Sequence, residues 1–219
     1  MWGTRAFWCV CENRCVSMKL GVLLSGRGSN MTAIADRIAD GRLLGAEIAV
    51  VISNVAGAPG LVAAEQRGLK TMTLESQGRK RVEHDAAVRE ALAAHGVELV
   101  ILAGYMRLLS PEFVRAYPLR ILNIHPSLLP AFPGLDAQRQ AWEYGVKIAG
   151  CSVHFVDEEL DHGVIVLQRA VAVDDGDTAE SLAEKILREE HEAYSEGIAR
   201  VISGEWRVQG RQYLRLRDE

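Results

Sequence analysis

A strand-like run that ends in polar side chains carries the clearest chemistry in this chain. Residues 121–125 read Ile-Leu-Asn-Ile-His, and Pro126 follows them. Successive side chains of a strand alternate between its faces, so Asn123 and His125 share one face. Pro126 has no backbone donor and ends the strand. An imidazole can exchange a proton near neutral pH, and a carboxamide can donate to a developing oxyanion. The pair suits attack on a carbonyl carbon, although polar residues that merely meet solvent would look the same.

An acidic turn further along the chain supplies a third polar group. Residues 150–156 alternate like a strand, and residues 157–163 read Asp-Glu-Glu-Leu-Asp-His-Gly, which is typical of a turn. Asp161 is therefore expected on a loop that presents its carboxylate.

These two segments resemble the motifs of the folate-dependent formyltransferases, most closely those of purine biosynthesis, and the similarity covers nearly everything from Met18 onward. The resemblance identifies Asn123, His125 and Asp161 as the catalytic trio. It implies formyl transfer from the co-substrate 10-formyltetrahydrofolate to the amine of glycinamide ribonucleotide. Asn123 would donate to the oxyanion, His125 would supply a proton, and Asp161 would favour the charged imidazole. This mechanism needs no metal.

The order of the predicted elements indicates an α/β fold. Strand patterns at 19–24, 47–52, 70–74, 98–103, 120–124, 149–156 and 164–173 alternate, early in the chain, with helical patterns. This alternation predicts a doubly wound, mostly parallel sheet, and the resemblance implies a Rossmann-like formyltransferase fold. A helix with one buried stripe and Gly41 as its C-terminal cap is predicted from Met31, Ile34, Ala35, Ile38 and Ala39. A second helix is expected at 81–95 and a hairpin around Gly210.

A glycine-containing loop at 25–30 joins the first strand to the first helix. Amides at a helix start bind phosphate, and Asn30 is expected to cap that helix. The dinucleotide fingerprint fails, because Met31 stands where a third glycine belongs and Ser53-Asn54 replaces the acid that would hold a ribose. A monophosphate therefore fits better, although an ordinary tight turn would have the same pattern. The resemblance places the substrate phosphate on Gly28, Ser29 and Asn30.

Glu190 interrupts the apolar face of the predicted C-terminal helix. That face consists of Leu182, Ile186, Ala193, Tyr194 and Gly197. A carboxylate there is costly unless it is paired, and a bond to a backbone donor or a basic side chain would explain it. The resemblance implies that Glu190 helps to hold the nucleotide. Leu187 stands where some relatives carry a polar residue, which puts part of that contact in question.

Residues 103–109 follow an apolar strand at the edge where open α/β sheets bind ligands. A plain strand-to-loop junction is the alternative. The resemblance assigns the pteridine pocket to Met106, Arg107, Leu108, Leu109 and Asn123, and a folate contact to Arg81. Arg81 could equally be a solvated arginine at a helix start. His154 is expected to line the site without acting in it.

Composition limits the remaining possibilities. With 219 residues, 48% of them hydrophobic, and a net charge of −4, one domain suffices and no basic surface for nucleic acid is expected. No apolar run reaches the ~20 residues of a membrane span. Residues 1–17 hold Cys9, Cys11 and Cys15 without a fourth ligand, so we expect no metal site there. We expect residues 1–17 to form a disordered leader and residues 18–219 to form a single domain. We expect a soluble, cytoplasmic monomer or homodimer, with Cys151 reduced.

Two alternative functions remain open at this stage. A formyltetrahydrofolate hydrolase would use the same three residues but give the formyl group to water. A non-catalytic phosphate-binding regulator could share the fold, but it would leave the coincidence of the trio unexplained.

Overall fold

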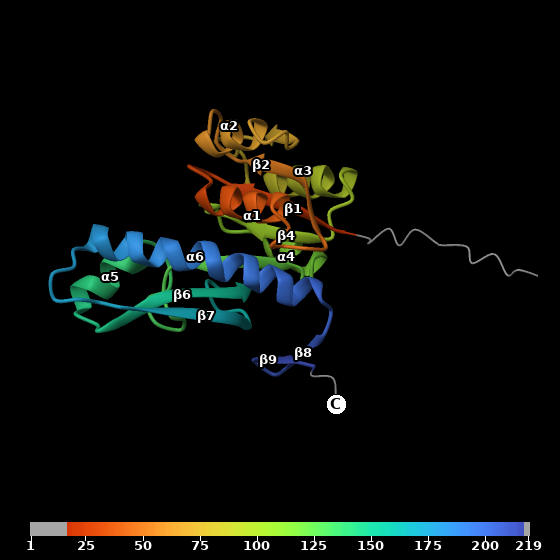
Figure 1. Cartoon of the computed structure of the whole chain (residues 1–219). Helices are drawn as coiled ribbons and strands as arrows, with labels where there is room; N and C mark the ends of the chain where they lie inside the picture. Colours follow the sequence, from red (N-terminus) through yellow and green to blue (C-terminus); the bar gives the residue numbers. More distant parts are fainter. Residues whose placement is uncertain (1–16, 217–219) are drawn as a thin grey trace, which may run out of the picture.

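The computed structural model describes residues 17–216, and a seven-stranded sheet forms its centre. Figure 1 shows helices packed around this sheet. Its strand order is β3-β2-β1-β4-β5-β6-β7. The first five strands are parallel, and β6 runs antiparallel to both of its neighbours. The strands are β1 (Met18–Leu24), β2 (Ala46–Ser53), β3 (Thr71–Thr73), β4 (Leu99–Leu102), β5 (Ile121–His125), β6 (Ile148–Phe155) and β7 (Ile165–Ala172). Each predicted strand is confirmed to within one residue at either end, as is the mostly parallel α/β sheet.

Helices cover both faces of this sheet because the strand side chains alternate. In β1, Val22 and Leu24 belong to one buried cluster, which includes α1 and α6, whereas Leu23 belongs to the other, under α3 and α4. The helices are α1 (Ser29–Ala39), α2 (Pro59–Glu65), α3 (Arg81–Ala94), α4 (Pro111–Ala116), α5 (Ala137–Tyr144) and α6 (Ala179–Ile202). Two buried cores on one sheet are what a doubly wound fold requires.

The predicted first helix is confirmed with one correction. Met31, Ile34 and Ala35 are buried, and Gly41 follows the helix with a φ of 77°. Ala39 is exposed instead of buried, and Arg37 takes the inward place because its guanidinium bonds to α6.

The long helix α6 contacts both the parallel strands β4 and β5 and the antiparallel strands β6 and β7. Its predicted apolar face is confirmed, and it packs on β6 and β7 so closely that a Cβ on Gly197 would lie 2.7 Å from Val153 Cγ1. The buried Tyr194 hydroxyl lies 2.9 Å from the Leu102 carbonyl and 2.8 Å from the Leu122 carbonyl, at β4 and β5. These contacts fix the strand ends that carry the candidate site.

A small antiparallel hairpin follows α6, as the sequence predicted. Its strands are β8 (Trp206–Gln209) and β9 (Gln212–Arg215). The predicted leader at 1–17, with its three cysteines, lies outside the described residues except for Ser17. None of the helices in the described range combines the length and apolar character needed to cross a membrane.

Candidate active site

The three predicted catalytic residues come together at the edge of the sheet. Asn123 and His125 lie on β5, paired with His154 and Ser152 of β6. Asp161 lies in the connection between β6 and β7, and its Oδ2 atom is 3.5 Å from His125 Nδ1. The side chains of His125 and Asp161 are 6% and 9% exposed, so their interaction is poorly screened by water.

Close backbone packing presents Asp161 to His125. Asp161 itself has a φ of 49°, and its Oδ2 accepts the Gly134 amide at 2.8 Å. A Cβ on Gly163 would lie 1.8 Å from the Phe155 carbonyl oxygen, so only glycine permits this approach. The acidic turn is therefore folded tightly back onto the end of β6.

The two ring nitrogens of His125 have different neighbours. Nε2 lies 2.9 Å from the Phe132 carbonyl, to which it donates. Nδ1 is left facing the Asp161 carboxylate. The separation of 3.5 Å exceeds that of a good hydrogen bond, and such contacts tighten when substrate binds.

His154 is closer to this chemistry than its alternation in the sequence indicated. It is 2% exposed, and burial lowers its pKa, so the ring is neutral at pH 7. Nδ1 donates to the Phe155 carbonyl at 2.8 Å, which leaves Nε2 as an acceptor for the Asn123 amide at 3.2 Å. The contact of Nε2 with Asp161 at 3.8 Å is then not an ion pair. His154 thereby fixes which end of the Asn123 carboxamide is the donor, leaving its second N–H available.

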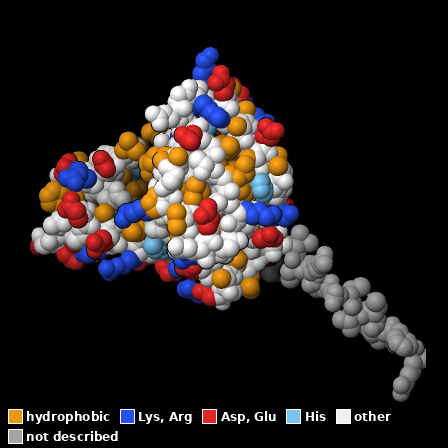
Figure 2. Space-filling view, turned by 90° about the horizontal axis from the view of Figure 1, so that it is seen from above, with side chains coloured by type: hydrophobic (Ala, Val, Ile, Leu, Met, Phe, Trp, Pro, Cys, Tyr) orange, Lys and Arg blue, Asp and Glu red, His pale blue; other side chains and the backbone are white. Residues whose placement is uncertain are grey.

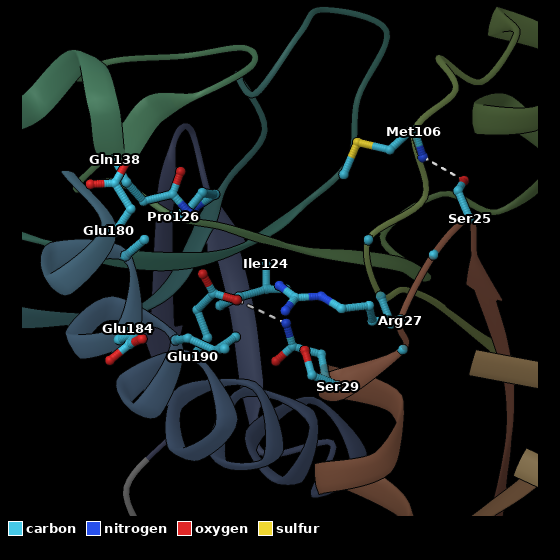
Figure 3. Close-up of a pocket in the computed structure, with 17 residues that line it drawn as sticks. Ser25, Arg27, Ser29, Met106, Ile124, Pro126, Gln138, Glu180, Glu184 and Glu190 are labelled. Atoms are coloured by element: carbon cyan, nitrogen blue, oxygen red, sulfur yellow. Dashed lines mark hydrogen bonds between the residues drawn. The ribbon is translucent and has the colours of Figure 1, made fainter. Parts of the chain in front are cut away.

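A cavity of about 620 Å³ lies on one side of β5, between the loop after β1 and helix α6 (Figure 3). Its walls include Gly28, Ser29, Asn30 and Glu190, which the sequence assigned to nucleotide binding, and also Leu187, which put part of that contact in question. The structure therefore brings together all four residues predicted to hold the nucleotide.

Asn30 does not cap helix α1, contrary to expectation. Gly28 occupies the cap position with a φ of 72° and provides no side-chain bond. Asn30 is turned inward, where its Nδ2 donates to Glu190 Oε2 at 2.8 Å. Its Oδ1 is buried and has no partner among the described residues, so it can accept a bond from a ligand.

Glu190 is buried against this amide instead of a backbone donor or a basic side chain. The residue is 6% exposed, and burial raises the pKa of its carboxyl to about 7, while the bond from Asn30 acts in the opposite direction. Glu190 can therefore be an acid or a carboxylate near neutral pH.

Arg27 was missed by the sequence reasoning, which expected a phosphate on this loop but assigned it to Gly28, Ser29 and Asn30 alone. It is the one Lys or Arg among the described residues that line this cavity, whereas α6 contributes Glu180, Glu184 and Glu190. In Figure 3 its side chain extends from the loop into the cavity. It is exposed and makes no ion pair within residues 17–216. The signal that could have identified it is its place between two glycines of a phosphate-type loop.

A second cavity lies at the other side of Asn123. It is lined by Arg81, Arg107, Leu108 and Leu109, and also by Asn123, His154 and Asp161. Met106, the remaining residue assigned to the pteridine, lies instead on the first cavity, 69% exposed, with its amide donating to Ser25 Oγ at 2.8 Å. Five of the six predicted folate residues, Asn123 among them, thus line one cavity together with Asp161 of the predicted trio.

No group of three or more metal-ligating side chains is found in residues 17–216. The described side chains beside the two cavities include an amide that can donate to an oxyanion and an imidazole–carboxylate pair that can exchange a proton.

Comparison with known proteins agrees with this geometry. Residues 18–198 match the formyl transferase family. The chain is 45% identical over 188 residues to the trifunctional purine biosynthetic protein adenosine-3 of Gallus gallus, covering 85% of this chain but only 19% of that protein. It is 43% identical over 178 residues to phosphoribosylglycinamide formyltransferase of Escherichia coli, covering 81% of this chain and 84% of the relative.

Solved structures give the same result. Glycinamide ribonucleotide transformylase 1 from Symbiobacterium toebii superposes with a TM-score of 0.89 at 47% identity, covering 98% of this chain and 99% of that one. A formyltetrahydrofolate deformylase from Pseudomonas syringae superposes with a TM-score of 0.86 at 26% identity, and this chain covers 66% of it. The chain therefore belongs to the formyl transferase family, in the branch of the phosphoribosylglycinamide formyltransferases.

Proposed function

We propose that this chain transfers the formyl group of 10-formyltetrahydrofolate to the primary amine of glycinamide ribonucleotide, a step of de novo purine biosynthesis. The observation that carries the proposal is the position of β5 between two cavities. Asn123 lines the second cavity, whereas Ile124 and Pro126 line the first. A formyl donor bound in one cavity and a formyl acceptor bound in the other would meet at the end of this strand.

The first cavity suits the nucleotide. Its phosphate would bind at the start of helix α1, on Gly28, Ser29 and Asn30, where amides and the helix dipole favour an anion. Arg27 would add a cation to the phosphate. Glu190 and the unpartnered Asn30 Oδ1 would accept bonds from ligand donors such as ribose hydroxyls.

The second cavity suits the folate. Leu108 and Leu109 offer apolar surface to a flat ring, and Arg81 and Arg107 offer cations to the carboxylates of its tail. This arrangement would place the formyl group near Asn123 and Asp161.

The reaction would proceed through a tetrahedral intermediate. The amine nitrogen attacks the formyl carbon, and the carbonyl electrons move to oxygen, where the unused Asn123 N–H donates to the oxyanion. Collapse breaks the bond to N10 of the folate. The amine loses one proton and N10 gains one, and His125 and Asp161 would relay it. Asp161 stabilises the imidazolium that forms during this transfer.

A deformylase is the second candidate, because such an enzyme shares this fold at 26% identity. It would transfer the formyl group to water and would not need a nucleotide cavity. Arg27 and the Asn30–Glu190 pair favour the transferase.

One assay separates the two activities. Purified protein is mixed with 10-formyltetrahydrofolate, with and without glycinamide ribonucleotide, and the deformylated folate is followed. The transferase predicts release only when the nucleotide is present, with formylated nucleotide as the product. Equal release without nucleotide, with formate as the product, would establish the deformylase.

We further propose a cytoplasmic monomer or homodimer without a required metal. Cys151 is buried in β6 as a free thiol, and burial raises its pKa to about 12, which keeps it protonated and unreactive. On the face in Figure 2, basic side chains alternate with acidic ones and do not gather into a patch for nucleic acid.

A further inference from the structure

The C-terminal hairpin reaches the loop that carries Asp161. Arg211, at the turn between β8 and β9, donates from one guanidinium nitrogen to the His162 carbonyl. Its other terminal nitrogen lies 2.7 Å from Nε2 of the His162 ring. Arg211 and Asp161 also line a common cavity. The hairpin is thus hydrogen-bonded to His162, the residue directly after Asp161, which is the predicted catalytic carboxylate.

The hairpin is itself firmly attached to the sheet and to α6. The Trp206 ring lies 5.5 Å from Tyr213 and 5.3 Å from Phe155, at the end of β6. Trp206 Nε1 donates to the Val201 carbonyl at 2.9 Å, and the Tyr213 hydroxyl to the Arg200 carbonyl at 3.0 Å. Arg211 therefore extends from a fixed base.

The loop needs such a contact because it is strongly acidic. Asp157, Glu158, Glu159 and Asp161 lie within five consecutive residues, and like charges so close together repel one another. Arg115 pairs with Glu158 at 2.9 Å at one end of the loop. At the other end, His162 bonds to Asp157 at 2.8 Å, and Arg211 holds His162.

We infer that Arg211 is a positioning residue for Asp161, and that the hairpin sets the distance between the Asp161 carboxylate and His125. The inference rests on the proposed function for its kinetic consequence, but not for its structural one. Without Arg211 the loop can move, and the contacts of Asp161 with His125 Nδ1 and the Gly134 amide lengthen. A misplaced catalytic group lowers turnover without weakening a nucleotide bound in a separate cavity.

The test compares Arg211→Ala with Arg211→Lys and with Arg207→Ala. Arg207 is an exposed arginine of the same hairpin that makes no ion pair or side-chain hydrogen bond among the described residues. Two readouts are measured: kcat and KM for both substrates, and hydrogen exchange of the Gly134 amide, which is bonded to Asp161 and not to the hairpin.

For Arg211→Ala we expect kcat to fall about tenfold, KM for the nucleotide to stay within about twofold, and Gly134 exchange to accelerate. Arg211→Lys should recover part of both losses, because an ammonium can still donate to the His162 carbonyl. Arg207→Ala should match the wild type.

Three results would overturn the inference. The first is unchanged exchange of the Gly134 amide in Arg211→Ala, and the second is an equal loss of kcat in Arg207→Ala. The third is an Arg211→Ala protein with a lower melting temperature whose kcat, measured below that temperature, equals that of the wild type. A wild-type protein that transfers no formyl group contradicts the proposed function instead, and the exchange of Gly134 still decides whether Arg211 positions Asp161.

Discussion

The proposed nucleotide side of this site and the chemical side, which carries the predicted catalytic trio, are built in different ways. The proposed phosphate site of the nucleotide cavity, at Gly28, Ser29 and Asn30, comes from one short segment where the loop after β1 enters α1, and the Asn30–Glu190 bond joins this segment to α6. The chemical side joins β5 to the turn after β6, which is held by the Gly134 amide, by the packing of its own Gly163 on Phe155 and by Arg211 of the hairpin.

This difference shows where each half is vulnerable. A loop that binds through backbone amides and a helix dipole depends little on distant side chains. A carboxylate held against an imidazole by long-range contacts depends on each of them. Changes on the first side should alter substrate affinity, and changes on the second side should alter turnover.

The largest effect is expected at His125. His125→Ala should lower kcat roughly 10³-fold, because general acid–base catalysis typically contributes 10²–10⁴-fold. Both ligands should still bind, since the imidazole acts mainly on the transition state. Steady-state kinetics with His95→Ala as the control would check this, because His95 follows α3 and its ring bonds to the Ala91 carbonyl of that helix instead of facing Asp161. A variant that kept most of its turnover would remove His125 from the mechanism.

Asn123 should follow closely. Asn123→Ala should lose roughly 10²–10³ in kcat, about 2.7–4 kcal/mol, which is typical for an oxyanion donor. His154→Ala should lose less, about tenfold, because it removes only the acceptor that orients the amide. Equal losses in the two variants would mean that His154 contacts the reacting atoms itself.

The pH dependence of the free energy of unfolding tests the environment of Glu190 on the proposed nucleotide side. The pKa of Glu190 is about 7 in the folded protein against a usual 4.5, so between these values the folded state keeps a proton that the unfolded state has lost. Its contribution to stability is therefore complete below pH 4.5 and is lost as pH rises through 7. This amounts to about 2–3 kcal/mol between pH 5 and 8, from roughly 1.36 kcal/mol per unit.

Glu190→Gln should remove that loss, because the amide cannot ionise. Urea unfolding at pH 5 and pH 8 would measure it, with Glu184→Gln as the exposed control on the same helix. His154 has a lowered pKa and acts with the opposite sign, but it is present in all three proteins and cancels. A Glu190→Gln protein with the wild-type pH dependence would show that Glu190 is already ionised at pH 5.

Substitution of Arg27 should have the smallest effect, and it should change only the affinity for the nucleotide. Arg27→Ala should raise KM for the nucleotide about tenfold, in line with a charged hydrogen bond, and leave KM for the folate and kcat unchanged. Arg27→Lys should recover part of the loss, since it keeps the charge. A rise in KM for the folate instead would show that Arg27 contacts the folate and not the nucleotide.

Sequence patterns predicted the sheet and the shared face of Asn123 and His125 because both follow from local order, whereas the trio as a whole was assigned through the family resemblance. The alternation in residues 121–125 determines which side chains share a face, and Gly163 marks the tight turn beside Asp161. Contacts between distant segments were beyond that reasoning. Asn30 bonds to Glu190 across 160 positions instead of capping its own helix, and His154 orients Asn123 from the neighbouring strand. Arg211 reaches His162 only because the hairpin folds back.

The separation of affinity from turnover is tested most directly by measuring nucleotide binding calorimetrically in the wild type, Arg27→Ala and His125→Ala. The account predicts that Arg27→Ala weakens binding about tenfold while keeping kcat, and that His125→Ala binds within about twofold of the wild type while losing turnover. If His125→Ala lost nucleotide affinity as strongly as Arg27→Ala, the two sides would not be separate and the account would be wrong.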